Sequence, residues 1–369
     1  MKFWRILVVI VLPFMLTSVV GAQDLWRGFE HLFTPARNYV VYKAIDKIDI
    51  DGRNDEKSWK HAKWSEYFID IEGDKQPVPT YRTRMKMLWD DTHLYILAEL
   101  EEPHIWAYYD KNDMIVFHEN DFEVFIDPTR DTHNYYEFEV NARNTLFDLF
   151  LNKPYRIGGS ANIEWDAEGF VSAVHIDGTL NDPSDEDKKW TVEMAIPFSS
   201  LSFDGDFVQP TADDVWKINF SRVEWHTEIV DGKYVRKKDE TTQKVLPENN
   251  WVWSEQGVVN MHFPERWGLL QFSGNPVNGK KQMFQLPTEE AWAKYLWLIY
   301  YKQQAYRGKH GSYAKKLTDL DISSSGNENG IGYKLSLSNE TNSFAATLKT
   351  EDGLIISING QGLFKVLDK

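Results

Sequence analysis

Hydrophobic and polar residues alternate along three stretches of this chain, Met85–Leu100, Asp121–Asp127 and Tyr135–Asn141. A period of two is typical of β-strands, because neighbouring side chains in a strand point to opposite faces of the sheet. In the first stretch the polar run Asp90–His93 interrupts the alternation as a turn would. We therefore predict a hairpin over the first stretch and one strand over each of the other two.

The last two of these strands each have an apolar and a polar side. The polar sides carry Asp121, Glu123, Phe125 and Asp127 on the first strand, and Tyr135, Glu137, Glu139 and Asn141 on the second. If the two strands pair, carboxylates, an amide and aromatic rings share one surface, a mixture that suits sugar hydroxyls and sugar ring faces. The alternative is the solvated outer face of an antiparallel sheet.

Further strand-like runs with Gly- and Asp-containing turns fill residues 39–272, where helical periodicity is nearly absent. The additional runs are residues 48–50, 170–176, 190–196, 215–223 and 267–272. Many short strands separated by such turns are typical of sandwiches and barrels. We predict an all-β, antiparallel sandwich of jelly-roll type.

The pattern changes after Ser273. Residues 273–287 are predicted to be a linker, and residues 288–369 a small α+β appendage with one helix and a small antiparallel sheet. Thr288 is the expected N-cap of a helix over Glu289–Tyr306, because two acids follow it in the first turn. Three strand-like runs come next, after a loop at Ser323–Asn329 that we expect to be flexible.

Residues 1–22 have the layout of a secretory signal peptide: a basic start, an apolar run and a small-residue site ending at Ala22. Residues 23–38 then form a lead-in to the sandwich. Residue 23 is Gln rather than Cys, so no lipid anchor is expected at the cleavage site. No later segment approaches the length of a membrane span. We predict a secreted or periplasmic protein, with association at the cell surface as a further option.

Composition narrows the function classes. The formal net charge is −15, which argues against binding to nucleic acid or to anionic lipid headgroups. The chain has no cysteine, so disulfides and thiolate metal sites are excluded. It has fifteen tryptophans and seventeen tyrosines, a surplus that fits a surface for stacking on flat ligands.

Several spaced motifs resemble the family 9 carbohydrate-binding modules. They are Ile48–Gly52 followed by Asp55, Glu56 and Trp59; Leu88–Asp91 with Leu94 and Tyr95; Asp121–Asp127 with Phe138–Asn141; and Trp251–Gly268 with its Trp253-Ser254 pair. They occur in the family's order and cover about residues 39–272. The resemblance implies a β-sandwich related to DOMON-type domains, which binds sugars and commonly accompanies plant-polysaccharide hydrolases.

The resemblance also implies particular site residues. Two tryptophans clamp a terminal sugar in the family, and their positions fall on Phe117 and Met261 here. A glutamate that binds hydroxyls is retained as Glu123, whereas a family arginine is replaced by Glu139. The ligand-binding candidates are Phe117, His118, Glu123, Glu139, Asn141, Arg222, Trp253 and His262.

Some of these residues have a second interpretation. Arg222 either pairs with a buried carboxylate or reaches a sugar hydroxyl, and one of Trp251 and Trp253 is expected to be buried. Glu123 and Glu139 are alternatively the carboxylate pair of a glycoside hydrolase. Sugar binding without catalysis, in polysaccharide or oligosaccharide utilisation, remains our first hypothesis.

No motif requires a cofactor. Calcium is a possible bound ion, because the turn with Asp49, Asp51 and Asp55 offers hard oxygen ligands. The alternative is that this turn is simply acidic and solvated. The C-terminal segment has a weaker resemblance to pilin-like modules, carried by Ile299-Tyr300, Gln303-Gln304, Tyr306, Gly311–Ala314, Leu317 and Leu320. An assembly or adhesion role, with a protein partner for this module, is therefore a third hypothesis.

Overall fold

The structure is a computed structural model that describes residues 25–203, 206–207, 209–340 and 342–368. The predicted signal peptide lies outside the described residues. Within the described part of the chain, no helix is long and apolar enough to cross a membrane.

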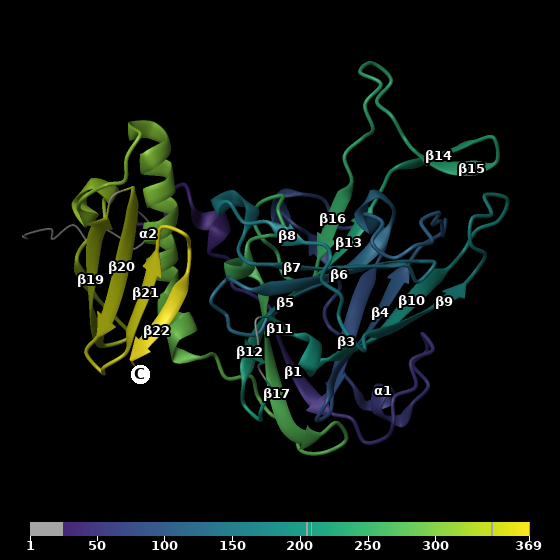
Figure 1. Cartoon of the computed structure of the whole chain (residues 1–369), viewed down its shortest axis with the longest axis horizontal. Helices are drawn as coiled ribbons and strands as arrows, with labels where there is room; N and C mark the ends of the chain where they lie inside the picture. Colours follow the sequence, from purple (N-terminus) through teal and green to yellow (C-terminus); the bar gives the residue numbers. More distant parts are fainter. Residues whose placement is uncertain (1–24, 204–205, 208, 341, 369) are drawn as a thin grey trace, which may run out of the picture.

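One sheet of thirteen strands forms two packed layers (Figure 1). The first layer contains β5 (Asp121–Asp127), β6 (Tyr135–Asn141), β7 (Leu146–Leu151), β8 (Ala161–Asn162), β13 (Val215–Glu224) and β17 (Gly268–Pro276), with β16 (Asn249–Val252) and β2 (Ile69–Asp70) beside it. The second contains β1 (Asn38–Lys43), β3 (Thr83–Trp89), β4 (His93–Glu101), β9 (Val171–Asp177) and β10 (Lys189–Pro197).

The remaining elements of this body are short. They are α1 (Lys57–His61), β11 (Ser202–Phe203), β12 (Asp206–Phe207), β14 (Thr227–Val230) and β15 (Lys233–Arg236). β11 pairs with β12 and β14 pairs with β15, outside the large sheet.

The two layers enclose the main core, as the alternation predicts. Phe122, Val124 and Ile126 of β5 point into it and are fully buried. They pack with inward side chains of the second layer such as Ile96 and Met194. The predicted all-β sandwich is confirmed. The expectation of purely antiparallel pairing is wrong at one strand, because β1 runs parallel to both of its neighbours, β17 and β3.

The C-terminal segment folds as one helix against a five-stranded meander. These elements are α2 (Thr288–His310), β18 (Ser325–Glu328), β19 (Ile331–Glu340), β20 (Ser343–Thr350), β21 (Ile355–Asn359) and β22 (Phe364–Asp368). The α+β appendage is confirmed. Several details differ from expectation. β18 occupies most of the predicted loop, β22 is an additional strand, and β17 extends to Pro276, into the predicted linker. Helix α2 ends at His310 rather than Tyr306, and Pro287 rather than Thr288 is its N-cap residue.

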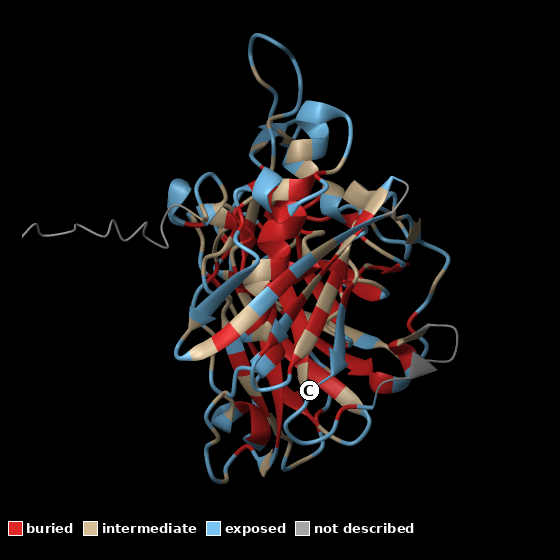
Figure 2. Ribbon diagram, turned by 90° about the vertical axis from the view of Figure 1, so that its left-hand side faces the viewer, coloured by how far each residue is buried: buried red, intermediate tan, exposed pale blue. Residues whose placement is uncertain are grey.

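Helix α2 lies between the small sheet and the sandwich, and buried positions run along it (Figure 2). On one side Leu296 and Ile299 join the core of the small sheet. On the other, the Tyr301 hydroxyl donates to Glu265 at 2.7 Å. Arg130 binds Glu289 and Glu290 in the first turn of α2, at 2.7 and 3.1 Å. Hydrogen bonds and ion pairs therefore connect the C-terminal α+β segment, which we call the C-terminal module, to the sandwich.

Candidate functional site

Four carboxylates gather on the outer face of the first layer. Asp121 and Glu123 come from β5, and Glu137 and Glu139 come from β6; we call this group the acidic cluster. Glu123 lies directly opposite Glu139 in the strand pairing, so their side chains point to the same face. One carboxylate oxygen each of Asp121, Glu123 and Glu139 lies within 4.8 Å of the other two. The strand pattern thus places the acids together as predicted.

The acidic cluster is covered, which the sequence did not indicate. Glu123 is 5 % exposed and Glu139 only 1 %. Apolar side chains of the same face, among them Val116, Phe125 and Met261, form a second core. Neither an open acidic surface nor a solvated outer face describes this side of the sheet. The alternation only sorts side chains between faces; segments distant in sequence decide how far each face is covered.

Burial makes ionisation of the acidic cluster costly. It raises the pKa of Glu123 to about 7. Burial together with the neighbouring carboxylates raises the pKa values of Asp121, Glu137 and Glu139 well above their ordinary range. Oxygen atoms without a hydrogen-bond partner remain on Asp121 (Oδ2) and Glu137 (Oε2), among the described residues. The cluster therefore has unused capacity to accept hydrogen bonds or bind a cation.

Aromatic rings border the acidic cluster. The Phe117 ring is 38 % exposed, and its backbone N–H donates to Glu139 Oε2 at 2.9 Å. Tyr155 is 46 % exposed, and Glu137 and Glu139 both raise the pKa of its hydroxyl, after the larger effect of burial. We call these two exposed rings the rim. Exposed aromatic rings near hydrogen-bond acceptors suit stacking on a sugar ring.

Two histidines accompany the rim. His262 packs edge-on against Tyr155 with ring centroids 4.5 Å apart, and its Nδ1 lies 3.1 Å from the Tyr135 hydroxyl. Burial and the nearby Arg156 lower the pKa of His262 to about 4, so its ring is neutral at neutral pH. His118 packs edge-on against Phe117 at 4.7 Å, and burial lowers its pKa as well. Both rings can donate or accept hydrogen bonds without adding charge.

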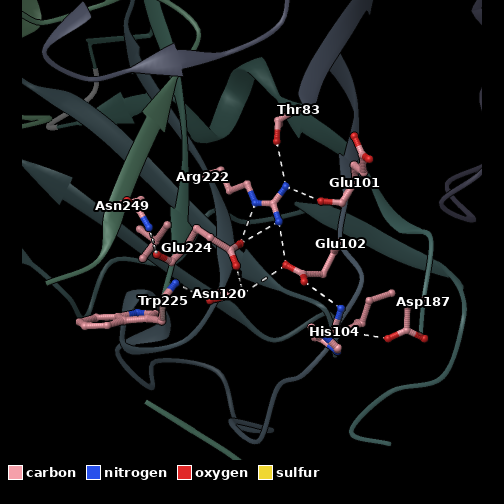
Figure 3. A network of polar contacts seen from close by, with 12 residues as sticks. Thr83, Glu101, Glu102, His104, Asn120, Asp187, Arg222, Glu224, Trp225 and Asn249 are labelled. Atoms are coloured by element: carbon pink, nitrogen blue, oxygen red, sulfur yellow. Dashed lines mark hydrogen bonds and ion pairs between the residues drawn. The ribbon is translucent and has the colours of Figure 1, made fainter. Parts of the chain in front are cut away.

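A buried network of polar contacts surrounds Arg222 (Figure 3). It reaches the segment that carries Phe117 through Trp225. Arg222 donates to Glu224 Oε2 and Glu102 Oε2, each at 2.7 Å from Nη2. Asn120 donates to Glu224 at 3.0 Å and accepts from the backbone N–H of Trp225 at 2.8 Å. Trp225 Nε1 then donates to the Phe117 carbonyl at 2.9 Å. Hydrogen bonds therefore connect Arg222 to the backbone of Phe117.

Four sequence-predicted ligand contacts are not available to a ligand. Glu139 is 1 % exposed and already accepts the Phe117 N–H. Arg222 is fully buried, and its pairing with buried carboxylates is the alternative that the sequence already offered. Asn141 is also fully buried. Its Nδ2 donates to Tyr109 O and Glu119, and its Oδ1 accepts two backbone N–H groups, so its hydrogen-bonding capacity is used. Trp253 is fully buried and packs over Gly268, where a Cβ would lie 2.2 Å from the indole. Trp251, at 4 % exposed, is buried too.

The structure does not assemble the predicted calcium turn. Asp49 pairs with Lys47, and Asp51 Oδ1 accepts from the Arg53 backbone at 2.9 Å. In the described chain, the acidic groups that could hold an ion are Asp121, Glu123 and Glu139, and separately Asp113, Asp148 and Asp166. The turn of Asp49, Asp51 and Asp55 is in neither group.

The sequence placed Asp121 and Glu137 on the polar face without including them among the ligand-binding candidates, and it gave no indication of Tyr155. Asp121 and Glu137 were visible, because they alternate in phase with Glu123 and Glu139. Tyr155 lies in the segment after β7, and no periodicity marks a loop residue as part of a site on another strand. The second clamp position, Met261, is 8 % exposed and packs in the core with Phe125, so it offers no ring to a ligand.

Comparison with known proteins identifies the family. Residues 50–259, more than half of the chain, match the family model described as carbohydrate family 9 binding domain-like. The chain belongs to this family. The resemblance predicted from the sequence motifs is thereby confirmed.

The chain is also similar, over part of its length, to individual proteins. Exoglucanase XynX of Acetivibrio thermocellus is 28 % identical over 117 residues, which is 32 % of this chain and 9 % of that protein. Endo-1,4-beta-xylanase A of Thermoanaerobacterium saccharolyticum is 28 % identical over 117 residues, 32 % of this chain and 8 % of that protein. The chain thus matches less than a tenth of the length of these relatives.

Solved structures show more distant similarity. A family 9 carbohydrate binding module of Caldicellulosiruptor kristjanssonii, in complex with glucose, aligns with a TM-score of 0.42 and 17 % identity, covering 66 % of this chain and all of that one. A putative carbohydrate-binding protein of Bacteroides uniformis aligns with a TM-score of 0.48 and 16 % identity, covering 65 % of this chain and all of that one.

Proposed function

We propose that this protein is an exported, non-catalytic carbohydrate-binding protein that acts in polysaccharide or oligosaccharide utilisation. The exposed rings of Phe117 and Tyr155 beside the acidic cluster are the observation that supports it most strongly. The family assignment supports the same ligand class. Residues 1–22, with the pattern of a signal peptide, support export to the periplasm or the medium.

In the proposed complex, a pyranose ring stacks on Phe117, and Tyr155 contacts it from the other part of the rim. Glu123 and Glu137, each 5 % exposed, are the least covered carboxylates of the acidic cluster, and in the proposal they accept hydrogen bonds from sugar hydroxyl groups. His118 and His262 supply neutral nitrogen atoms. Affinity is modest, because sugar hydroxyls give up strong hydration to form these bonds.

Replacement of Phe117 by Ala tests the proposal. A glycan array of the purified protein first identifies a retained sugar. F117A should then weaken retention about tenfold, the equivalent of about 1.4 kcal/mol of stacking. The melting temperature should stay nearly unchanged, because the ring is 38 % exposed. Tyr67, which is 45 % exposed and contacts Arg82 and Arg84, provides the control variant Y67A. Equal retention by F117A and the wild type would remove Phe117 from the site.

Hydrolysis is the alternative that the carboxylate pair raises. A glycosidase needs two carboxyl groups that flank the scissile bond. Glu139 is 1 % exposed and already accepts the Phe117 N–H, so it is poorly placed to reach such a bond. We therefore do not propose catalysis. Release of reducing ends from a polysaccharide panel, abolished in E123Q, would overturn this part of the proposal.

A further inference from the structure

The acidic cluster brings four carboxyl groups together with no basic side chain, in the described part of the chain, to balance their charge when they ionise. Asp121, Glu123, Glu137 and Glu139 are all at least 95 % buried. The largest influences on their pKa values are burial, each other and hydrogen bonds to neutral groups. Arg156, which lies near Tyr135 and His262, is bound by both oxygens of Glu265, at 2.7 and 2.9 Å. Buried charges are ordinarily paired with an opposite charge or coordinated to a metal.

We propose that Asp121, Glu123 and Glu139 bind a hard divalent cation, Ca²⁺ in the first place, with Glu137 as a further ligand. Their oxygens lie within 4.8 Å of one another. Oxygens bound to one Ca²⁺ at roughly 2.4 Å each lie no more than about 4.8 Å apart, so this spacing is compatible with one ion shared by the three carboxylates. A donor set made only of carboxylates favours such cations over zinc or copper.

Two unused acceptors support the assignment independently of the clustering itself. Glu137 Oε2 is buried and accepts from no N–H or hydroxyl donor among the described residues, while the Glu137 carboxyl group lies close enough to Glu139 to share a proton with it. Asp121 Oδ2 is likewise buried without a partner, while its Oδ1 accepts the Val223 N–H at 3.3 Å. A buried carboxylate oxygen without a donor costs free energy, and a bound cation removes that cost.

The cation also connects to the rim. Glu139 Oε2 accepts the Phe117 N–H, so a cation that orients the Glu139 carboxylate also fixes the backbone of the stacking residue. Protein carboxylates need not fill the coordination of Ca²⁺, which takes six to eight oxygens, so water or a sugar hydroxyl can occupy the rest. This second step rests on the proposed sugar-binding function. It makes sugar binding dependent on the cation.

Calorimetric titration of the purified protein after chelation with EDTA tests the cation site without any sugar. The wild type should bind one Ca²⁺ per chain at the acidic cluster. D121N and E123Q should each weaken binding at least tenfold. The control is D148N, which alters the separate group of Asp113, Asp148 and Asp166. Both D121N and E123Q are used so that the test still works if one of them misfolds. Circular dichroism checks that each variant is folded.

The proposal is overturned if the wild type binds none of Ca²⁺, Mg²⁺ and Mn²⁺. It is also overturned if D148N abolishes binding while D121N and E123Q retain it. Retention on the glycan identified above, measured in EDTA and in CaCl₂, tests the second step. Retention only in CaCl₂ supports it. Retention unchanged by EDTA overturns the dependence but leaves the proposed function intact. Ca²⁺ binding with no retention of any glycan leaves the cation site intact and contradicts the proposed function.

Discussion

The buried arginine beneath the rim allows a prediction with a magnitude that follows from the structure. Arg222 makes five hydrogen bonds while fully buried, to the side chains of Glu224, Glu102 and Thr83 and to the Glu101 carbonyl. Replacement by Met removes all five and leaves two carboxylates, 2 % and 6 % exposed, without their counter-charge. Loss of one partner from a buried ion pair costs about 3–5 kcal/mol. We expect R222M to lose that much free energy of unfolding.

The size of the loss should depend on pH in a defined direction. Burial and Glu224 already raise the pKa of Glu102 well above its ordinary value, and Arg222 opposes the rise. Without Arg222 the folded state binds protons still more tightly than the unfolded state. Stability of R222M should therefore decrease, relative to the wild type, as the pH rises from 5 to 8. Addition of E102Q and E224Q to R222M should restore at least about 1 kcal/mol, because no buried charge then remains in the network.

Urea unfolding followed by far-ultraviolet circular dichroism measures these differences. The matched control is R84M, because Arg84 also pairs with a glutamate, Glu99 at 2.8 Å, but both side chains are partly exposed, at 29 % and 19 %. A partly exposed pair contributes about 0–1 kcal/mol. If R222M lost no more stability than R84M, the account of the buried network would be refuted. A loss that did not vary with pH would show that the two carboxylates are not the source of the cost.

Three further predictions follow. Burial raises the pKa of Glu193 to about 7, although the N–H groups that donate to its carboxylate act in the opposite direction. Ionisation of Glu193 should therefore lower the free energy of unfolding by up to about 3 kcal/mol as the pH rises from about 4.5 to 7. Stability should fall with rising pH in that window, and pH-dependent urea titrations of E193Q should lack this contribution. A Cβ at Gly257, which has φ +78°, would lie 2.0 Å from a backbone carbonyl oxygen, whereas Gly232, with φ +73°, has open space. G257A should thus lower the melting temperature clearly more than G232A, and equal shifts would contradict the steric argument. R130M removes the ion pairs to α2 and should accelerate proteolytic cleavage within residues 277–287; an unchanged cleavage rate would show that these pairs do not hold the module.

The sequence alone determined the all-β body and the sidedness of its strands. A strand alternates its side chains with a period of two whatever surrounds it, so Phe122, Val124 and Ile126 could be assigned to one face and Asp121, Glu123 and Asp127 to the other. The helix and most of the small sheet after residue 287 followed from equally local patterns. The family could also be identified from sequence, because its motifs are short contiguous segments that can be read without knowing the tertiary structure.

The tertiary structure decided which of those side chains meet a ligand. Arg222 lies against Glu102, 120 residues earlier in the chain, and Trp253 packs over Gly268. Their burial depends on which segments cover them, and no local period encodes that. Tyr155 joins the rim because the chain after β7 passes beside Glu137 and Glu139. The acids share a face because of strand alternation, but they form a nearly enclosed group because distant loops exclude water from that face.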